Sequence, residues 1–333
     1  MSGFSRTKVY ITVDIEASIA GCFSEPKQNP PLFDEPVFGY VDGRSEALDF
    51  ILRTLSASNL SATFFTESLQ GRYFGDNKMA KVAESIIENG QDLQLHIHPC
   101  WINFNNGALT LSTEYNDRST GRSVDELVYT FSEAIERFKM WGVGAPVAVR
   151  TGNFSAGADT FQALAQLNIR STSNISIGLC PPKEKSLLLN HGIHNIHGLL
   201  ELPLTTYAAF DFKGSKAVRG FTVTGTSVSE MISLLEQAFA QKLESICILT
   251  HPFEFIKRDD YRFANMSIHK LNQGRLEFLC QYIERNNDRF ETGTLKDINL
   301  QDVKSYSNEL VLKSSYLQSL SRAGQNFISD RMA

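Results

Sequence analysis

The sequence predicts an α/β protein built around a parallel sheet. Short apolar runs rich in β-branched residues alternate along the chain with segments whose apolar residues recur at helical spacing. Strands that are repeatedly followed by helices are typical of parallel sheets, because the helix carries the chain back across the sheet before the next strand. With 333 residues the chain is long enough for one α/β barrel or two ordinary domains, and no repeat or linker stands out.

The individual elements follow from these two periodicities. Strands are predicted at the apolar runs 9–13, 62–65, 93–96, 146–150, 245–250 and around Phe290. Helices are predicted at 45–58, 78–89, 124–141, 158–167, 227–241 and 270–286. Ser123 and Ser227 are each followed three residues later by a glutamate, which is the pattern of a capping box and marks the start of a helix.

Two segments are less regular. Residues 178–207 contain Pro181 and Pro182 and predict a hairpin or edge strand rather than a helix. Beyond Leu300, spaced apolar residues predict one more helix followed by a polar tail at 322–333; these residues are Val303, Leu310, Leu312, Leu317 and Leu320. We therefore expect a main domain over residues 1–299 and a C-terminal helical extension and tail over residues 300–333.

The composition excludes several classes of function. The 32 Lys and Arg residues against 37 Asp and Glu give a net charge of −5, with no basic run suited to nucleic acid. No apolar segment is long enough for an integral membrane helix, and no leader peptide is recognisable, so we expect a cytoplasmic protein. The five cysteines are scattered and form no C-x-x-C pair, which argues against a disulfide framework and a cysteine zinc site.

Acids and histidines occur in pairs at the ends of two predicted strands. Asp14 and Glu16 end the first strand, and His96 and His98 end the third, just before Pro99. Side chains two residues apart on a strand point to the same face, so each pair is predicted to converge. Two histidines at this spacing suit one metal ion.

Further polar residues follow other strands. Arg150 and Asn153 follow the fourth strand, and His251 and Glu254 follow a later one. The carboxyl ends of parallel strands meet at one edge of the sheet or barrel, where active sites form. The long polar loops 17–43 and 100–122 leave this same edge and are predicted to be functional, as are Thr66 and Glu67 at the site rim. We expect substrate contacts from Asn153, Trp101 and Glu254.

This set of residues indicates metal-assisted hydrolysis. Two histidines and a carboxylate leave coordination positions open; zinc is the first expectation, with cobalt or iron as alternatives. A second carboxylate can then take a proton from water, and a separate histidine can protonate the leaving amine. The rival group His191, His194 and His197 is disfavoured, because a spacing of three puts successive residues on opposite faces of a strand.

Five segments in order resemble the motifs of polysaccharide deacetylases: residues 12–16 (TVDIE), 62–65 (ATFF), 96–99 (HIHP), 150–154 (RTGNF) and 249–252 (LTHP). The resemblance spans about residues 8–295, and the short His-x-His-Pro and Arg-x-Gly-Asn forms are similar to a branch acting in bacterial surface-polysaccharide assembly. It implies a distorted barrel of about seven β/α units.

The resemblance also implies the removal of N-acetyl groups from sugars and a role for each matching residue. By it, Asp14 is the general base, Arg150 orients the base and His251 is the general acid. Glu16, His96 and His98 are the metal ligands by the same resemblance. The family usually has adjacent aspartates and H-x-x-x-H, where this chain has Asp-x-Glu and H-x-H. Asp14 and Glu16 can therefore exchange roles, and His98 can reach metal or substrate.

We expect a metal-dependent hydrolase that removes N-acetyl groups from a sugar or a surface-polysaccharide precursor. Two alternatives stay open at this point. One is a related hydrolase of carbon–nitrogen bonds in cyclic amides or ureides that works without a metal. The other is a catalytically silent sugar-binding barrel. The sequence predicts neither the exact sugar and its carrier nor the oligomeric state.

Overall fold

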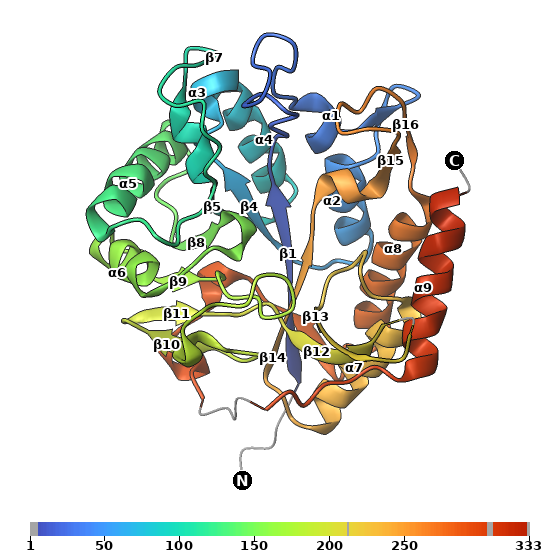
Figure 1. The fold of residues 1–333 in the computed structure, drawn as a ribbon. Coiled ribbons are helices and arrows are strands. Elements are labelled where there is room, and N and C mark those ends of the chain that lie inside the picture. The colour runs from blue at the N-terminus through green and yellow to red at the C-terminus, as the bar shows by residue number, and fades with distance from the viewer. Residues whose placement is uncertain (1–5, 212, 305–308, 332–333) are drawn as a thin grey trace.

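The computed structural model describes residues 6–211, 213–304 and 309–331. Its centre is a curled nine-stranded sheet that forms part of a barrel (Figure 1). From one side to the other, the parallel strands are β11 (Leu199–Glu201), β9 (Ser171–Thr172), β8 (Ala148–Thr151), β5 (Asp92–Ile97), β4 (Thr63–Glu67), β1 (Thr7–Ile15) and β14 (Ser245–Thr250). β10 (His194–Ile196) pairs antiparallel with β11, and β17 (Phe290–Thr292) pairs parallel with β1. The predicted distorted β/α barrel is confirmed.

Helices cover the outside of the sheet (Figure 1). Apart from the C-terminal helix, the long ones are α2 (Leu48–Ala57), α4 (Asp76–Glu88), α5 (Val124–Met140), α6 (Ala158–Gln166), α7 (Val228–Ala240) and α8 (Lys270–Arg285). Each matches a predicted helix, and both predicted capping boxes are present: Ser123 and Ser227 accept from the backbone N–H of Glu126 and Glu230. The short ones are α1 (Asp34–Val37) and α3 (Gly71–Phe74).

The loops add small hairpins and single turns of 3₁₀ helix. The hairpins are β2 (Tyr40–Val41) with β3 (Arg44–Ser45), β6 (Phe104–Asn105) with β7 (Ala108–Leu109), β12 (Thr206–Phe210) with β13 (Lys216–Gly220), and β15 (Ile256–Arg258) with β16 (Met266–Ile268). The 3₁₀ turns are η1 (Pro99–Asn103), η2 (Gly152–Phe154), η3 (Lys185–Leu187), η4 (Pro252–Phe255), η5 (Leu295–Asp297) and η6 (Leu300–Asp302). Within 178–207, the predicted hairpin is formed by β10 and β11.

Two apolar clusters explain how the sheet is held. Val9, Ile11 and Val13 belong to the large cluster that includes the helices, whereas Tyr10 belongs to a smaller cluster with Leu249 and residues of other strands. Because strand side chains alternate, β1 presents one face to the helices and the other to the interior of the barrel. The interior face continues beyond Tyr10 to polar residues at the carboxyl end of the strand, where the candidate site lies.

The C-terminal helix lies further along the chain than predicted. α9 (Tyr316–Arg331) occupies most of the predicted polar tail, while the predicted helix start at Leu300 is a single 3₁₀ turn. Leu312 is buried in an extended segment beside Ala208, whose N–H donates to the Leu312 carbonyl. Residues 305–308 of the predicted helix and 332–333 of the predicted tail lie outside the described residues.

α9 lies further along the chain than predicted because its buried contacts with the rest of the molecule are mainly polar. Leu317 and Leu320 face solvent, whereas Arg322 is buried and lies 3.5 Å from Glu230 of α7. Asn326 accepts a hydrogen bond from the buried Arg275 of α8. Apolar spacing was therefore the wrong signal for this helix. Among the described residues, no helix is both long and apolar enough to cross a bilayer.

Candidate active site

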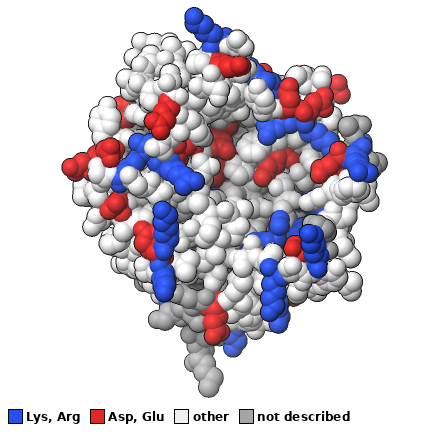
Figure 2. All heavy atoms as spheres, in the orientation of Figure 1, with Lys and Arg blue, Asp and Glu red and all other residues white. Residues whose placement is uncertain are grey.

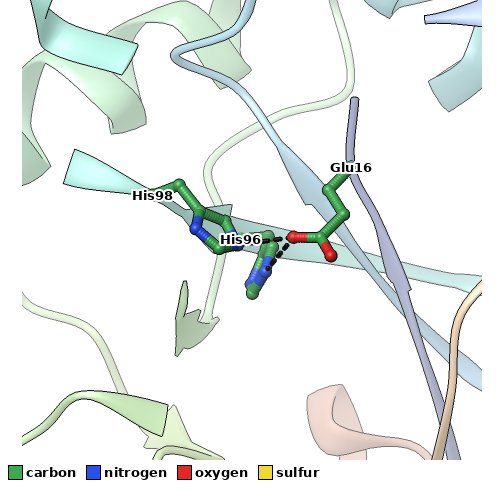
Figure 3. Close-up of side chains that lie close together, drawn as sticks. All are labelled: Glu16, His96 and His98. Atoms are coloured by element: carbon green, nitrogen blue, oxygen red, sulfur yellow. Dashed lines mark ion pairs between the residues drawn. The ribbon is translucent and has the colours of Figure 1, made fainter. Parts of the chain in front are cut away.

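Glu16, His96 and His98 form a compact cluster at the carboxyl ends of β1 and β5 (Figure 3). One ligand atom from each lies within 4.8 Å of the others. Glu16 Oε2 is 2.5 Å from His98 Nε2 and 3.5 Å from His96 Nε2. The convergence follows from the sheet: β4 lies between β1 and β5, all three run parallel, and their ends meet at one edge. The structure thus brings together the three residues predicted as metal ligands.

Both imidazoles present the same nitrogen to the cluster because the other nitrogen is already engaged. His96 Nδ1 donates to the carbonyl oxygen of Arg150 at 2.8 Å. His98 Nδ1 lies 2.5 Å from Asp117 Oδ2. When the rings are neutral, each hydrogen bond keeps the proton on Nδ1 and leaves the lone pair on Nε2, which is how metal-binding histidines are usually oriented. Two oriented Nε2 atoms and one carboxylate oxygen, on one buried and two partly buried side chains, fit a divalent metal ion.

Asp117 is the centre of the contacts around His98. Its side chain is buried and also accepts hydrogen bonds from Asn153 Nδ2 at 2.8 Å, Cys100 N at 3.2 Å and Tyr115 OH at 3.3 Å. Burial opposes the charged form of His98, but the carboxylates of Asp117 and Glu16 outweigh it and hold the pKa of His98 well above its usual value.

Asp14 lies beside the cluster and is held by a fully buried arginine. Arg150 Nη1 donates to Asp14 Oδ1 at 2.7 Å and to Thr12 Oγ1 at 2.9 Å, and Arg150 also donates to the backbone and side chain of Ser173. The guanidinium stacks on the rings of Phe65 and Phe154. Asp14 Oδ2 is left facing the cluster, 4.0 Å from His96 Nε2.

His251 approaches the same point from β14. Its Nε2 is 3.9 Å from Asp14 Oδ2 and 3.9 Å from Glu16 Oε1. Behind the ring, Nδ1 lies 3.3 Å from Glu254 Oε1, and Glu254 Oε2 accepts from Thr250 Oγ1 and the His251 backbone N–H. Burial lowers the pKa of His251, but Glu254, followed by Glu16 and Asp14, outweighs burial and raises it to about 9.

These residues form the floor of one large cavity. It has a volume of about 900 Å³ and is lined by Asp14, Glu16, His96, His98, His251 and Asn153, together with parts of the loops after β7 and β9. Figure 2 shows a hollow at the centre of this face, with acidic atoms deep inside and Lys and Arg atoms around its margin. A volume of this size is near the upper end of the range for small-molecule sites, about 300–1,000 Å³.

Two of the predicted substrate contacts are not at the cavity. Trp101 is 1% exposed and packs against Phe104 and Phe74, with ring centroids 5.0 and 5.8 Å away. The prediction for Trp101 was wrong because the 3₁₀ turn after Pro99 directs its side chain into the core. Glu254 does not line the cavity either, because its carboxylate faces His251 and Thr250 from behind.

The sequence did not predict a role for Asp117, and it placed Glu67 only at the rim of the site. Asp117 is one of two acids in the long loop 100–122, with Glu114, and no spacing marks it; the only signal was that this loop follows the histidine strand. Glu67 is fully buried and accepts from the backbone N–H groups of His98 and Leu69. Burial outweighs the attraction of His98 and raises the pKa of Glu67 to about 8.

Comparisons with known proteins give a match at the level of structure. No protein-family model and no curated protein sequence matches the chain. A structure from Mycobacterium smegmatis assigned to the polysaccharide deacetylases is similar over 88% of this chain and 89% of its own, with 13% identity and a TM-score of 0.52.

Two further similar structures have lower TM-scores. The first is a family 4 carbohydrate esterase from Streptomyces lividans in complex with acetate. The similarity covers 87% of this chain and 93% of the esterase, with 10% identity and a TM-score of 0.43. The second is a family 4 acetyl xylan esterase from Clostridium thermocellum in complex with a cobalt ion, with 11% identity, 87% and 89% coverage, and a TM-score of 0.41. The order of the parallel strands and the Mycobacterium smegmatis match together show that this chain has the distorted β/α-barrel fold of the polysaccharide deacetylases.

Proposed function

We propose that this protein is a metal-dependent hydrolase that removes N-acetyl groups from a sugar or a surface-polysaccharide precursor. The observation that carries the proposal is the arrangement at the cavity floor. A cluster of one carboxylate and two imidazoles lies about 4 Å from a second carboxylate, Asp14, and from a third imidazole, His251, which also face each other. The choice of an N-acetylated sugar follows the resemblance of the five motifs and the shared fold.

Glu16, His96 and His98 are the proposed metal ligands, with zinc as the first choice and cobalt or iron as alternatives. A divalent ion bound there supplies a Lewis acid that polarises the acetamide carbonyl and acidifies water. Glu16 rather than Asp14 is proposed as the carboxylate ligand, because its Oε2 contacts both imidazoles while Asp14 is held by Arg150. Asp117 positions the His98 ring from the opposite side.

Asp14 is the proposed general base. Arg150 occupies Oδ1, so Oδ2 faces the ligand cluster and is free to accept a proton from the attacking water. The water oxygen forms a bond to the acetamide carbon as its proton passes to Asp14. Because Arg150 is fixed by Thr12 and Ser173, the carboxylate keeps its orientation without further support from substrate.

His251 is the proposed general acid. With its pKa near 9 the ring carries a proton at neutral pH, and its Nε2 faces the same point as Asp14 Oδ2. Transfer of this proton to the sugar nitrogen lets the carbon–nitrogen bond break, so that acetate and the free amine leave. Glu254 holds the ring from behind and is a positioning residue.

The experiment that tests this proposal is acetate release from N-acetylhexosamine derivatives by protein loaded with zinc or cobalt. We expect release that a chelator abolishes and that added metal restores. Asp14→Asn and His98→Ala are expected to remove it, whereas Asp125→Asn, on the exposed start of α5, serves as the matched control. Full activity in either active-site variant contradicts the proposal, and full acetate release without metal contradicts its metal dependence. No acetate release, together with metal-free hydrolysis of a cyclic amide or ureide, favours the alternative hydrolase.

A further inference from the structure

The mouth of the cavity carries two cationic side chains that nothing in the proposed reaction uses. Arg118 lies on the loop between β7 and α5, and Lys183 lies on the loop between β9 and β10; both are exposed and both line the cavity. Within the described residues neither side chain has an ion-pair partner within 4 Å. They are unbalanced positive charges in a chain whose net charge is negative.

The acids that line the same cavity do not neutralise these two cations. Asp14 is paired with Arg150, Asp117 with His98, and Glu16 with the two imidazoles. Glu184 also lines the mouth next to Lys183, where its Oε1 accepts from the backbone N–H of Ala158, and within the described residues it forms no ion pair within 4 Å with Lys183 or Arg118. The cavity therefore has a floor whose acids are paired and a margin where Arg118 and Lys183 have no ion-pair partner within 4 Å among the described residues.

Both cations stand on loops with a defined backbone. The N–H of Arg118 donates to Asn116 Oδ1 at 3.2 Å, its carbonyl accepts from Arg122 Nε at 2.8 Å, and the preceding Asp117 is fixed at the cavity floor. Lys183 follows Pro181 and Pro182, whose rings restrict the backbone. The turn before them is closed by a hydrogen bond from the Cys180 N–H to the Ser176 carbonyl. Defined backbones reduce the entropy lost when a ligand is bound.

We propose that the substrate carries an anionic group, a phosphate ester or a carboxylate, which Arg118 and Lys183 bind at the cavity mouth while the acetamide reacts at the floor. This inference rests on the proposed deacetylase function and specifies its substrate class. A guanidinium and an ammonium form charge-assisted hydrogen bonds with either group, and the cavity has room for a group beyond the reacting sugar.

The test compares three substrates that share the reacting acetamide: the neutral methyl glycoside of N-acetylglucosamine, N-acetylglucosamine 1-phosphate and N-acetylmuramic acid. We expect kcat/KM for one of the charged compounds to exceed that for the neutral compound by about tenfold or more, mainly through KM. The two charged compounds distinguish a phosphate from a carboxylate. Raised salt is expected to reduce the preference, because the mouth is open to solvent.

The variants decide whether these two residues are responsible. In the double variant Arg118→Ala, Lys183→Ala the preference is expected to fall to near one. Lys185→Ala, which removes an exposed lysine two residues further on that does not line the cavity, is expected to retain it. Equal kcat/KM for charged and neutral substrates, or a preference that survives in the double variant, overturns the inference.

Failure of the proposed function is distinguishable from failure of this inference. If no compound releases acetate, the deacetylase proposal fails. Calorimetric titration of the metal-loaded protein with the same three compounds then decides the inference by itself. Tighter binding of a charged compound that the double variant loses supports the anionic site, and equal or absent binding of the charged and neutral compounds contradicts it.

Discussion

His96 and His98 stand two residues apart at the end of a central strand, whereas His191, His194 and His197 stand three residues apart around an edge strand. The first two rings lie edge to face, with centroids 4.7 Å apart and an interplanar angle of 81°. In the second group His191 is buried, His194 is half-buried at the start of β10, and His197 lies in the following turn with a φ of 51°. The spacing of the histidines and their position in the sheet, rather than their number, decide which group can hold one metal ion together.

The acids near the two histidine groups differ in whether their carboxylates contact the imidazoles. Glu16 and Asp117 contact the two nitrogens of His98 directly. Glu201 is the register partner of His194, but its carboxylate accepts from Thr172 Oγ1 and from two backbone N–H groups after β9. Burial dominates the second group and lowers the pKa of His191 to about 4. One region is therefore arranged for chemistry and the other for packing.

Replacing one histidine from each group by alanine is expected to have very different consequences. His98→Ala is expected to lower kcat/KM by about a thousandfold or more and to remove bound metal, because one of three proposed ligands is lost. His197→Ala, in an exposed turn, is expected to change neither. Elemental analysis and acetate release measure both. If His197→Ala loses metal while His98→Ala keeps it, the two groups have been interpreted the wrong way round.

Two amide variants distinguish the roles of the two carboxylates at the end of β1. Asp14→Asn is expected to lower kcat by about a hundredfold or more while metal content is unchanged, because the amide cannot accept a proton. Glu16→Gln is expected to lower metal content instead. Metal stoichiometry and kcat are measured on both variants. The opposite pattern, with metal lost from Asp14→Asn and kept by Glu16→Gln, shows that the two acids have exchanged roles.

Much of the fold was predictable because local patterns and tertiary burial agree. The helix after Ser123 has both a capping box and an apolar stripe, and both are used in the structure. The same-face argument for Asp14 with Glu16 and for His96 with His98 needed only that strand side chains alternate. That argument depends on neighbours along the chain, and it places the pairs without knowledge of the rest of the molecule.

The rest depends on contacts between distant segments, which single-sequence patterns do not report. Asp117 lies 19 residues from its partner His98, in a loop without periodicity. The side chain of Trp101 is directed by a 3₁₀ turn rather than by the parity of a strand. The position of α9 depends on Arg322 reaching Glu230, 92 residues earlier in the chain. Each of these is a polar or geometric feature that the spacing of apolar residues does not report.

Replacing Asp117 is expected to weaken metal binding without abolishing it. Asp117→Asn is expected to weaken metal affinity by about 10- to 100-fold, because the carboxylate that orients the His98 ring is lost. Competition with a chromophoric chelator measures the affinity without substrate. The cobalt absorption spectrum of the loaded variant is expected to change, and Asp125→Asn is the matched control. Unchanged affinity and spectrum, with reduced stability alone, assign Asp117 a structural role only.

The smallest effect concerns Glu201, the acid of the second histidine region. Burial raises the pKa of Glu201 from its usual 4.5 to about 7, against the hydrogen bonds from Thr172, Ile175 and Asn174, which lower it. Between these two values the folded state holds a proton that the unfolded state releases. The contribution of Glu201 to the free energy of unfolding is therefore expected to fall as pH rises from about 4.5 to 7, by at most about 1.4 kcal/mol per pH unit.

Glu201→Gln removes this titration but retains a carbonyl acceptor for the backbone N–H groups, so its free energy of unfolding is expected to depend less on pH over the same range. Urea unfolding of metal-free protein at pH 5, 6, 7 and 8 measures the difference, and Glu284→Gln on the exposed face of α8 is the control. Parallel pH curves for Glu201→Gln and the wild type contradict the raised pKa. A loss of metal affinity in Glu201→Gln contradicts the separation of the two regions, because Glu201 contacts neither His96 nor His98.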